Sequence, residues 1–350
     1  MAELHAFDLV TGEPYGRLDV SQLQWSERIN ARLDLSCRLD LAHRPSRELA
    51  PSLLPGRTKL VLVDGPIVKS FILWETSYTE RRFLNLRAAG LWSWFQQMPL
   101  QRFFRFNNRE QFEIAAELIN WAQAPAQGGG IGVDVDISPP SGVLRDRTYR
   151  RFEFAPVGQR VDELAAVNGG FDFAIDSTFD GNVTVTDTWR PSYPRAGTTW
   201  PASALQVDAQ NAAELTVDES APIRAILEVG AGEGVDQIDA ALGVTPSPYP
   251  PLWKVVSRKT VERQATLFNH ARRDFELHNR QTEAWAVTVM DKYDALKGLT
   301  VGDEANITVA PGDFRFPDGT EEVRRVIGRS VSVPDDGGPE RVALTLENRE

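Results

Sequence analysis

The sequence is poor in the residues that build disulfides and metal sites. It contains one cysteine, Cys37, and four histidines in 350 residues. A single cysteine forms no internal disulfide and no multi-thiolate zinc site. His270 and His278 lie eight residues apart on a predicted helix, so they do not share the i, i+4 face of a helical zinc site. We therefore expect no bound metal.

Positive charge and long apolar runs are also scarce. Lys and Arg number 38 against 49 Asp and Glu, which gives a net charge of -11 and a pI near 5.0. Because stable nucleic-acid binding depends on cations that neutralise phosphates, this balance argues against a protein that grips DNA, although DNA could still slide past its surface. No run approaches the ~18 apolar residues of a membrane span, and the N-terminus lacks a basic start followed by an apolar stretch. We expect a soluble chain without stable membrane insertion or an export signal.

The first ninety residues carry the pattern of short β-strands. Residues 31–41 alternate apolar and polar side chains, and Cys37 falls in phase with the leucines, which indicates a core position rather than a nucleophile. Further apolar runs separated by tight turns lie at 59–63, 67–74 and 81–86. Short strands with tight connections predict an antiparallel β-barrel or sandwich over residues 1–90.

Helical periodicity begins after residue 91. One amphipathic helix is predicted within 107–123, capped by Asn107 or Asn108, and a second follows Pro156 and stops at Asn168-Gly169. Strands are expected around these helices at 133–137, 149–154, 171–175 and 182–188. We expect an inserted α+β domain over residues 91–190 within a mostly antiparallel β framework.

The remaining chain returns to β structure. Residues 191–256 are expected to form a connecting β segment that contains the proline-rich linker 245–251. Residues 257–350 are predicted to hold a helix from about Ser257 and then a second β domain. The predicted inner stripe of the helix is Val261, Ala265, Phe268, Arg272 and Phe275, and the strands are expected at 285–289, 305–309, 323–333 and 341–347.

Two distant parts of the chain resemble each other. From Gly56 and again from Gly302 the sequence reads glycine, strand, turn, strand, turn, strand. The repetition indicates two similar β modules at opposite ends of the chain.

A glycine-rich segment at 226–243 suggests a cofactor site, but the sequence that follows it does not fit such a site. Gly230, Gly232 and Gly234 follow a predicted strand, as in the first turn of a methyltransferase or Rossmann unit. Such a unit needs an acid at the end of a second strand about 20 residues later, but the chain runs into proline-rich sequence instead. A glycine turn is the preferred interpretation, and an S-adenosylmethionine or nucleotide site the alternative. We expect no cofactor.

An aromatic and basic segment is the best candidate for an interface. Aromatic residues and arginine dominate protein hot spots, but they also form sugar-binding platforms and fill cores between domains. The sequence contains no nucleophile elbow and no phosphate-binding loop, and no carboxylate pair stands out, so we identify no catalytic residue and expect no enzyme. A carbohydrate-binding or glycan-processing module is the rival hypothesis. The candidate interface residues are Trp92, Trp94, Phe95, Arg102, Phe103 and Phe104.

The order of these segments resembles a known family, the minor tail proteins of actinobacterial siphophages that act as baseplate hubs, which are related to the hubs of contractile phage tails. The resemblance spreads over most of the chain rather than resting on one motif. Its segments are LLPGRTKLVLVDG at 53–65, REQFEIAAELINWAQ at 109–123, YRRFEFAPVGQRVDELAAVNGGFDFAID at 149–176, VGAGEG at 229–234, PLWKVVSRKTVERQATL at 251–267 and LTVGDEANITV to RRVIGRSV at 299–331.

The resemblance implies a structural virion protein at the distal end of the tail. Such a hub is a homotrimer with two tube-like β domains per chain, so that three chains match a six-fold tube to a three-fold tip. The implied partners are a distal tail or tail tube protein, tip fibre or spike proteins and the tape measure protein, with DNA only in transit during ejection. An acidic lumen would suit that passage because like charge repels phosphate. Other hubs continue into fibre or lytic regions, whereas this sequence ends at Glu350, so we expect receptor binding and cell-wall cutting to belong to other subunits. The family supplies no catalytic residue.

Overall fold

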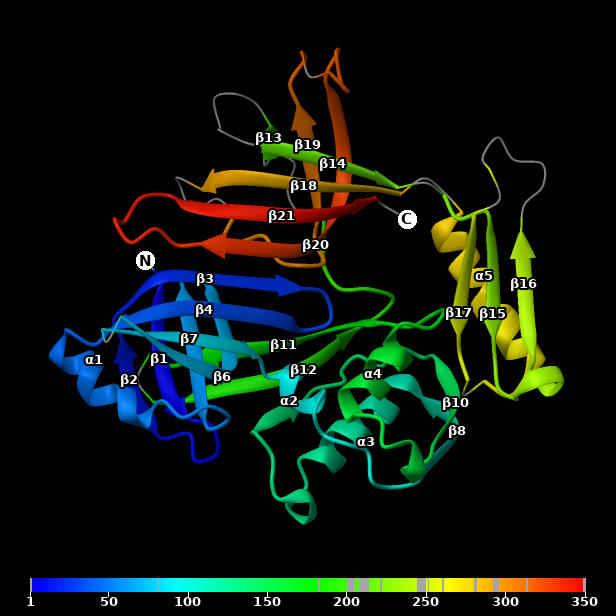
Figure 1. Cartoon of the computed structure of the whole chain (residues 1–350), viewed down its shortest axis with the longest axis horizontal. Coiled ribbons are helices and arrows are strands. Elements are labelled where there is room, and N and C mark those ends of the chain that lie inside the picture. The colour runs from blue at the N-terminus through cyan, green and yellow to red at the C-terminus, as the bar shows by residue number, and fades with distance from the viewer. Residues whose placement is uncertain are drawn as a thin grey trace. The chain divides into compact units, whose positions relative to one another are not determined.

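The computed structural model describes residues 2–80, 82–181, 183–199, 205–207, 214–220, 222–243, 250, 252–259, 261–279, 282–291, 296–312 and 314–348. Contacts divide the chain into two compact units, which we call the main unit, residues 1–215 with 286–350, and the small unit, residues 216–285. The fold is α+β with mostly antiparallel strands, as the sequence predicts. Figure 1 shows the elements in chain order.

The strands at the two ends of the chain belong to one large sheet. Its strand order is β14-β18-β21-β20-β3-β4-β7-β6-β5-β1-β2, and β19 pairs with both β20 and β13. The strands of the first part are β1 (Glu3–Asp8), β2 (Pro14–Leu18), β3 (Val20–Arg28), β4 (Arg32–Asp40), β5 (Thr58–Asp64), β6 (Ile67–Thr79) and β7 (Phe83–Gly90), with helix α1 (Arg44–Leu49) after β4. The others are β13 (Leu205–Val207), β14 (Glu214–Ser220), β18 (Thr282–Asp291), β19 (Glu304–Val309), β20 (Thr320–Ser332) and β21 (Glu340–Asn348).

Strand β4 shows why these segments form half-buried strands. Its odd-numbered residues from Leu33 to Leu39 are buried, and its even-numbered ones are not. Cys37 lies among the buried residues, where burial raises the pKa of its thiol to about 12. The prediction that Cys37 is a core residue is confirmed, because a thiol so hard to ionise is a poor nucleophile.

The same strand order occurs twice in this sheet. The first module has the order β3-β4-β7-β6-β5-β1, and the second has β14-β18-β21-β20-β19-β13. In each, the third strand along the chain pairs with the sixth, and the fourth, fifth and sixth strands form an antiparallel meander. The last pairings differ, because β1 lies antiparallel to β5 whereas β13 lies parallel to β19. The internal similarity inferred from Gly56 and Gly302 is therefore a duplicated strand order.

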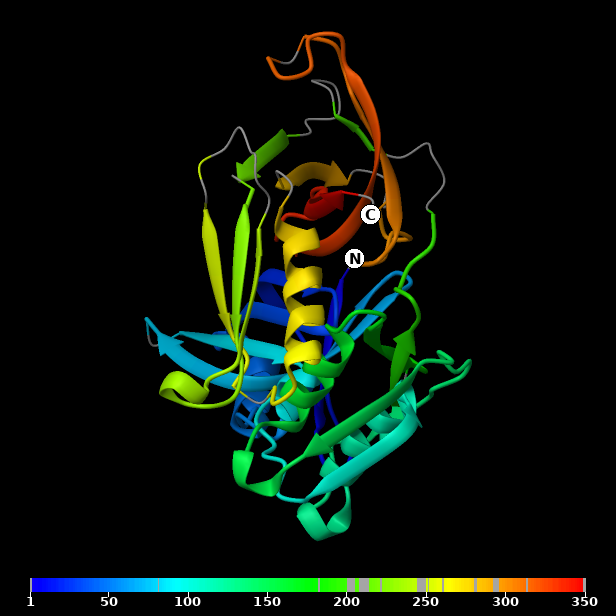
Figure 2. The ribbon, with the colours of Figure 1, turned by 90° about the vertical axis from the view of Figure 1, so that its right-hand side faces the viewer.

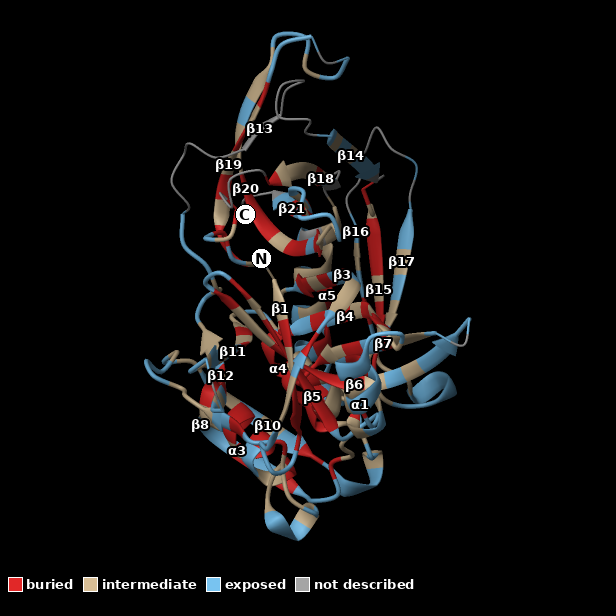
Figure 3. Ribbon diagram, turned by 90° about the vertical axis from the view of Figure 1, so that its left-hand side faces the viewer, coloured by how far each residue is buried: buried red, intermediate tan, exposed pale blue. Residues whose placement is uncertain are grey.

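An α+β segment interrupts the sheet between β7 and β13. It packs a buried aromatic and aliphatic cluster, including Trp92, Phe112 and Trp189, against Ile72 of β6. Figure 3 shows buried residues concentrated on β5 and on the helices of this segment. Its elements are α2 (Trp92–Phe95), β8 (Phe104–Glu110), α3 (Gln111–Ala122), β9 (Val133–Val135), β10 (Leu144–Tyr149), α4 (Val157–Ala165), β11 (Asp172–Phe179) and β12 (Val185–Ser192).

Two local predictions in this segment are wrong. Helix α3 begins at Gln111 and is capped by Glu110, whose carboxylate accepts hydrogen bonds from the backbone N–H groups of Phe112 and Glu113. The predicted caps, Asn107 and Asn108, lie within β8 instead, at a register shift in its pairing with β10, where Asn108 has a φ of +49°. The expected strand at 149–154 ends at Tyr149, and a short 3-10 helix follows at Arg151–Glu153.

The small unit contains a three-stranded sheet and one helix. Strand β15 (Ala225–Val229) lies between antiparallel β16 (Asp239–Gly243) and parallel β17 (Trp253–Ser257), and helix α5 (Gln264–His278) packs on one face (Figure 2). The predicted helix start at Ser257 is wrong, since β17 occupies that stretch. The predicted inner stripe is wrong as well, because Ala265, Phe268 and Arg272 are exposed while Leu267 and Ala271 are buried against Ala240. The predicted boundary at 256/257 falls inside this unit.

Candidate functional site

The middle strands of the two modules share one irregularity at the same position. Strands β6 and β20 are both 13 residues long, and each carries a β-bulge at its eighth residue, Trp74 and Ile327. In each module a glycine with positive φ donates its N–H to the carbonyl just before the bulge. Gly56 donates to Leu73 and Gly302 to Val326, both at 2.7 Å. The two strands are therefore divided at equivalent points into a first and a second half.

The second half of β20 joins the two modules. Its first half pairs with β19 up to Arg325, and beyond the bulge residues 328–332 pair instead with β3 of the first module. The backbone N–H of Ile29 also donates to the carbonyl of the bulge residue Ile327 at 3.1 Å. The bulge thus lets one strand change neighbours, since the extra residue bends the strand and increases its local twist. We call the β3–β20 pairing the module junction.

Buried charges mark the module junction. Glu27 of β3 lies directly opposite Arg329 of β20 in the register, and its carboxylate contacts the Arg329 guanidinium at 2.7 Å and the Lys69 ammonium at 2.5 Å. Arg329 also lies over the ring of Trp25, 4.8 Å from its centroid. Burial alone would raise the pKa of Glu27, but Lys69 and Arg329 outweigh burial and hold that pKa below its usual value. Two cations against one carboxylate keep the buried site paired.

A second ion pair ties the modules together near the end of β5. Lys297 contacts the buried carboxylate of Asp64 at 2.5 Å and that of Glu340, at the start of β21, at 3.6 Å. All three side chains are largely buried. Sequence reasoning missed the residues of both ion-pair clusters; the available signal was a charged side chain at an inward position of a predicted strand, as for Arg329.

The second half of β6 is the open counterpart of the module junction. Strand β5 covers β6 only up to Ile72, and residues 75–79 pair with β7 on the other edge. Within the part of the chain that the structure describes, no strand covers the other edge of residues 75–79, where β20 receives β3. Tyr78 in this stretch is 59% exposed. We call residues 75–79 the open edge of β6.

Polar side chains fix the sheet beside the open edge. Arg38 of β4 donates to the side chain of Asn85 on β7, which in turn donates to the hydroxyls of Ser77 and Thr79 on β6 at 3.2 and 2.6 Å. Two cations also pack on one ring here: the guanidinium groups of Arg38 and Arg82 lie 4.6 and 4.9 Å from the centroid of the Phe83 ring. The open edge is therefore held in a defined extended shape.

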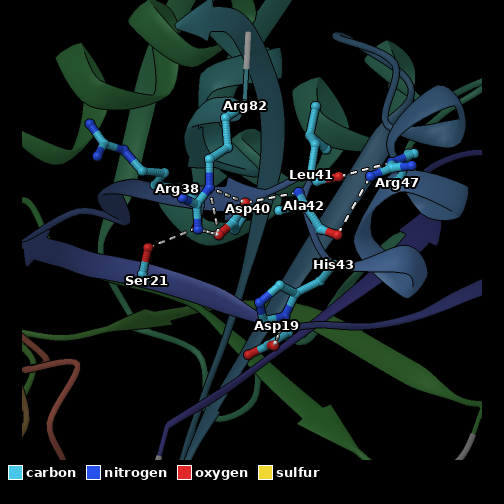
Figure 4. Close-up of polar contacts among 9 residues, drawn as sticks. All are labelled: Asp19, Ser21, Arg38, Asp40, Leu41, Ala42, His43, Arg47 and Arg82. Carbon is cyan, nitrogen blue, oxygen red and sulfur yellow. Dashed lines mark hydrogen bonds and ion pairs between the residues drawn. The ribbon is translucent and has the colours of Figure 1, made fainter. Parts of the chain in front are cut away.

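The adjoining turn after β4 is equally ordered (Figure 4). Arg82 binds the Asp40 carboxylate through both Nε and a terminal nitrogen, and the N–H of Ala42 donates to the same carboxylate at 2.9 Å. Arg82 first, and then the Ala42 N–H, hold the pKa of Asp40 well below its usual range. Arg47 of α1 donates to the carbonyl of Leu41 at 2.9 Å, which links the helix to the end of the strand.

The candidate interface residues predicted from the sequence divide into two groups. Trp92, Phe95 and Phe104 are at most 4% exposed and belong to the core of the α+β segment, with Trp94 packed against it. A buried Trp92 cannot stack on a sugar, which argues against the alternative of a sugar-binding platform at this residue. Phe103 is 57% exposed, and Arg102 is also exposed, with its guanidinium 5.1 Å from the centroid of the Phe104 ring. Among the six candidates, these two are the exposed ones, and Trp94 is partly buried.

The glycine-rich segment is a turn in a β-hairpin. After β15 the chain passes through Gly230, Gly232 and Gly234 and returns antiparallel as β16. Gly232 has a φ of +100°, and a Cβ at that position would lie 2.3 Å from the carbonyl oxygen of Asp236. The glycines thus serve a tight turn, and the strand-to-helix geometry of a nucleotide site is not formed. Among the described residues no cluster of three or more His, Cys, Asp or Glu could hold a metal ion, and no helix is long and apolar enough to cross a membrane.

Comparison with known proteins identifies the fold. No protein-family model matches the sequence, and no curated protein matches it. Among solved structures, a tail protein from Neisseria meningitidis MC58 aligns over 99% of this chain and 96% of its own, with a TM-score of 0.61 and 12% identity. The 43 kDa tail protein of prophage MuSo2 from Shewanella oneidensis aligns over 99% and 98%, with a TM-score of 0.57 and 12% identity. The prophage tail protein gp18 from Listeria monocytogenes EGD-e aligns over 99% and 94%, with a TM-score of 0.56 and 14% identity.

These alignments run along nearly the whole of both chains. The chain therefore has the fold of phage tail proteins, and the match includes both modules, the α+β segment and the small unit. At 12–14% identity the likeness concerns the fold.

Proposed function

We propose that this protein is a structural component of a phage tail that assembles as a homotrimer, closes the distal end of the tail tube and adapts its six-fold symmetry to a three-fold tip. The observation that carries the proposal is the duplicated strand order with equivalent bulges in β6 and β20. Three copies of a chain with two similar modules present six similar modules, which is what a six-fold tube can bind. The fold shared with phage tail proteins supports the same role.

The open edge of β6 supports a ring of three chains. In the second module, the equivalent half of β20 is covered by β3, the strand that precedes β4. The counterpart of β3 in the second module is β14, which is the terminal strand in the order of the sheet. Pairing of β14 from one copy with residues 75–79 of the next would repeat the module junction between chains. Such a head-to-tail contact closes into a ring and covers a strand edge that would otherwise invite aggregation.

The remaining parts of the proposal follow from that ring. Its faces would bind a distal tail or tail tube protein on one side and tip fibre or spike proteins on the other, with the tape measure protein and DNA in the lumen. The role is structural and needs no catalysis. An acidic lumen wall, consistent with the net charge of -11, would let DNA pass without sticking.

Proline substitutions on the open edge test the trimer. Successive N–H groups of a strand point to opposite edges of that strand. Proline removes the N–H group, so one of the two variants Ser77→Pro and Tyr78→Pro loses a donor to β7, and the other loses a donor on the open edge. We expect the open-edge variant to keep the Tm of the wild type and to lose the trimer, measured by native mass spectrometry as three times the 39.0 kDa of one chain. The other variant is its matched control and should lose stability first.

A cryo-EM map of the tail tip gives the second measurement. The proposal requires three copies of the chain and six modules around one axis, with β14 beside β6 of the neighbouring copy. A single copy in the tip, or trimers that persist in both proline variants, would contradict it.

A further inference from the structure

Exposed phenylalanine and arginine side chains gather at one end of the β8–β10 pair. Phe104 and Tyr149 face each other in the register and are buried, whereas Arg105, the next residue of β8, points to the outer face. Phe103 and Arg150, which flank the two strands, are also exposed. Phe103 is 57%, Phe152 70% and Phe154 60% exposed. We call this surface the Phe-Arg patch, and its residues are Arg102, Phe103, Arg105, Arg150, Phe152 and Phe154.

The exposed aromatic rings are costly to keep in water. At about 200 Å² for each buried phenylalanine, the exposed fractions amount to roughly 350 Å² of apolar surface. Exposed apolar surface of that extent on a single protein is often functional. Burial of each ring would lower the free energy, but in the folded chain these rings stay in contact with water.

The backbone at Phe154 is strained as well. Phe154 ends the short 3-10 helix with a φ of +48°, in the left-handed region that a bulky residue rarely adopts. Strain of this kind persists where the surrounding structure imposes it, and it concentrates at binding sites. Here the strained residue presents an exposed ring beside Phe152, whose own ring lies 5.8 Å from the Arg150 guanidinium.

The patch is basic within an acidic chain. Its three cations are all arginines, whereas the whole chain has a net charge of -11. Two carboxylates near the patch have partners elsewhere: Glu153 binds Arg160, and Asp146 accepts the N–H of Asn108 at 2.7 Å. A guanidinium group binds a carboxylate in a bidentate fork, and arginines beside aromatic rings are the typical composition of protein hot spots.

We propose that the Phe-Arg patch is a docking surface for a neighbouring tail protein whose contact face carries carboxylates around apolar sockets. The inference rests on the proposed function for the location of that partner. Compared with the interface predicted from the sequence, the patch keeps Phe103 and Arg102 and leaves out the buried Trp92, Phe95 and Phe104. The added residues are Arg105, Arg150, Phe152 and Phe154. The rings lie next to the β8–β10 pair and on the short 3-10 helix that follows it, and this ordered backbone favours a protein partner because the rings lose little conformational entropy on docking.

Site-specific photo-crosslinking in assembled particles tests the docking surface. A benzophenone amino acid at Phe152 should crosslink to one other tail protein, within a segment rich in Asp and Glu that mass spectrometry identifies. The same probe at Val10, which is 74% exposed in the turn between β1 and β2, is the matched control and should not crosslink to that segment. Crosslinks to DNA, to lipid, to another copy or within this chain, or none at Phe152 in particles that contain the chain, would overturn the inference.

A charge swap supplies the second readout. Arg150→Glu should reduce incorporation of the crosslinked partner at least tenfold, and exchange of the facing partner carboxylate for arginine should restore it. Phe154→Gly should weaken docking without lowering Tm, since glycine adopts the left-handed backbone freely. Failure of the swap to rescue incorporation would overturn the inference, whereas absence of the chain from purified particles would overturn the proposed function instead.

Discussion

At the scale of single residues, the small unit contains a carboxylate that favours its protonated form. Glu228 is fully buried, and its Oε2 accepts from Arg258, which also donates to Asp274 at 2.9 Å. Burial first, and then Asp274, raise the pKa of Glu228 to about 7, against the opposing effect of Arg258. Because the unfolded chain releases this proton at lower pH, stability of the small unit should fall as pH rises from about 4.5 to about 7 and then level off.

Glu228→Gln should remove that fall. At pH 4 the variant and the wild type should melt together, and at pH 8 the variant should have the higher Tm, followed through the fluorescence of Trp253 or hydrogen exchange of the α5 amides. Parallel Tm curves of the two proteins across this range would show that Glu228 does not hold the extra proton.

At the scale of elements, Gly56 and Gly302, which donate to the carbonyls just before the two bulges, differ in what an added side chain would contact. A Cβ at Gly56 would approach only the Trp74 ring, at 3.9 Å, whereas one at Gly302 would lie 3.0 Å from backbone atoms of Ala196. Both have positive φ, +75° and +109°, so alanine is strained at each. We expect Gly56→Ala to cost about 1–2 kcal/mol in the free energy of unfolding, and Gly302→Ala clearly more, because a backbone neighbour must shift.

Gly12→Ala isolates the backbone contribution. Gly12 has a φ of +72° and no atom within 4 Å of the Cβ position, so its cost should match that of Gly56→Ala in urea unfolding. Equal costs at Gly56 and Gly302 would contradict the close approach to Ala196.

At the scale of the whole molecule, the buried charges of the module junction stabilise the contact between the two modules of the main unit. Arg329→Met leaves Glu27 with Lys69 alone in a buried site, and we expect a loss of about 3 kcal/mol in the free energy of unfolding. Adding Glu27→Gln should recover part of that loss, which a double-mutant cycle measures. Independent single-mutant costs that simply add would show that Glu27 and Arg329 do not interact across the junction.

Much of the β framework was predictable because alternation reports burial directly. Leu33, Leu35 and Leu39 place one face of β4 in the core, and the similar runs from Gly56 and Gly302 indicated the duplicated meanders. Helix limits were less accurate where long-range pairing decides the local structure, as at Asn107 and Asn108, which lie at a register shift in the β8–β10 pair rather than at the start of a helix. The candidate interface was only partly predictable, because an aromatic sequence reads alike whether its rings, as at Phe95 and Phe103, lie in the core or in water.

The sequence by itself determined the composition class, the acidic charge, most strands and the recurrence of one β pattern, since these depend on neighbours along the chain. Tertiary structure alone decided that the second half of β20 leaves β19 for β3, that the matching half of β6 stays open, and that three phenylalanines remain exposed beside arginines. These features depend on which distant residues meet, through a bulge that redirects a strand and a core that accepts some rings and excludes others.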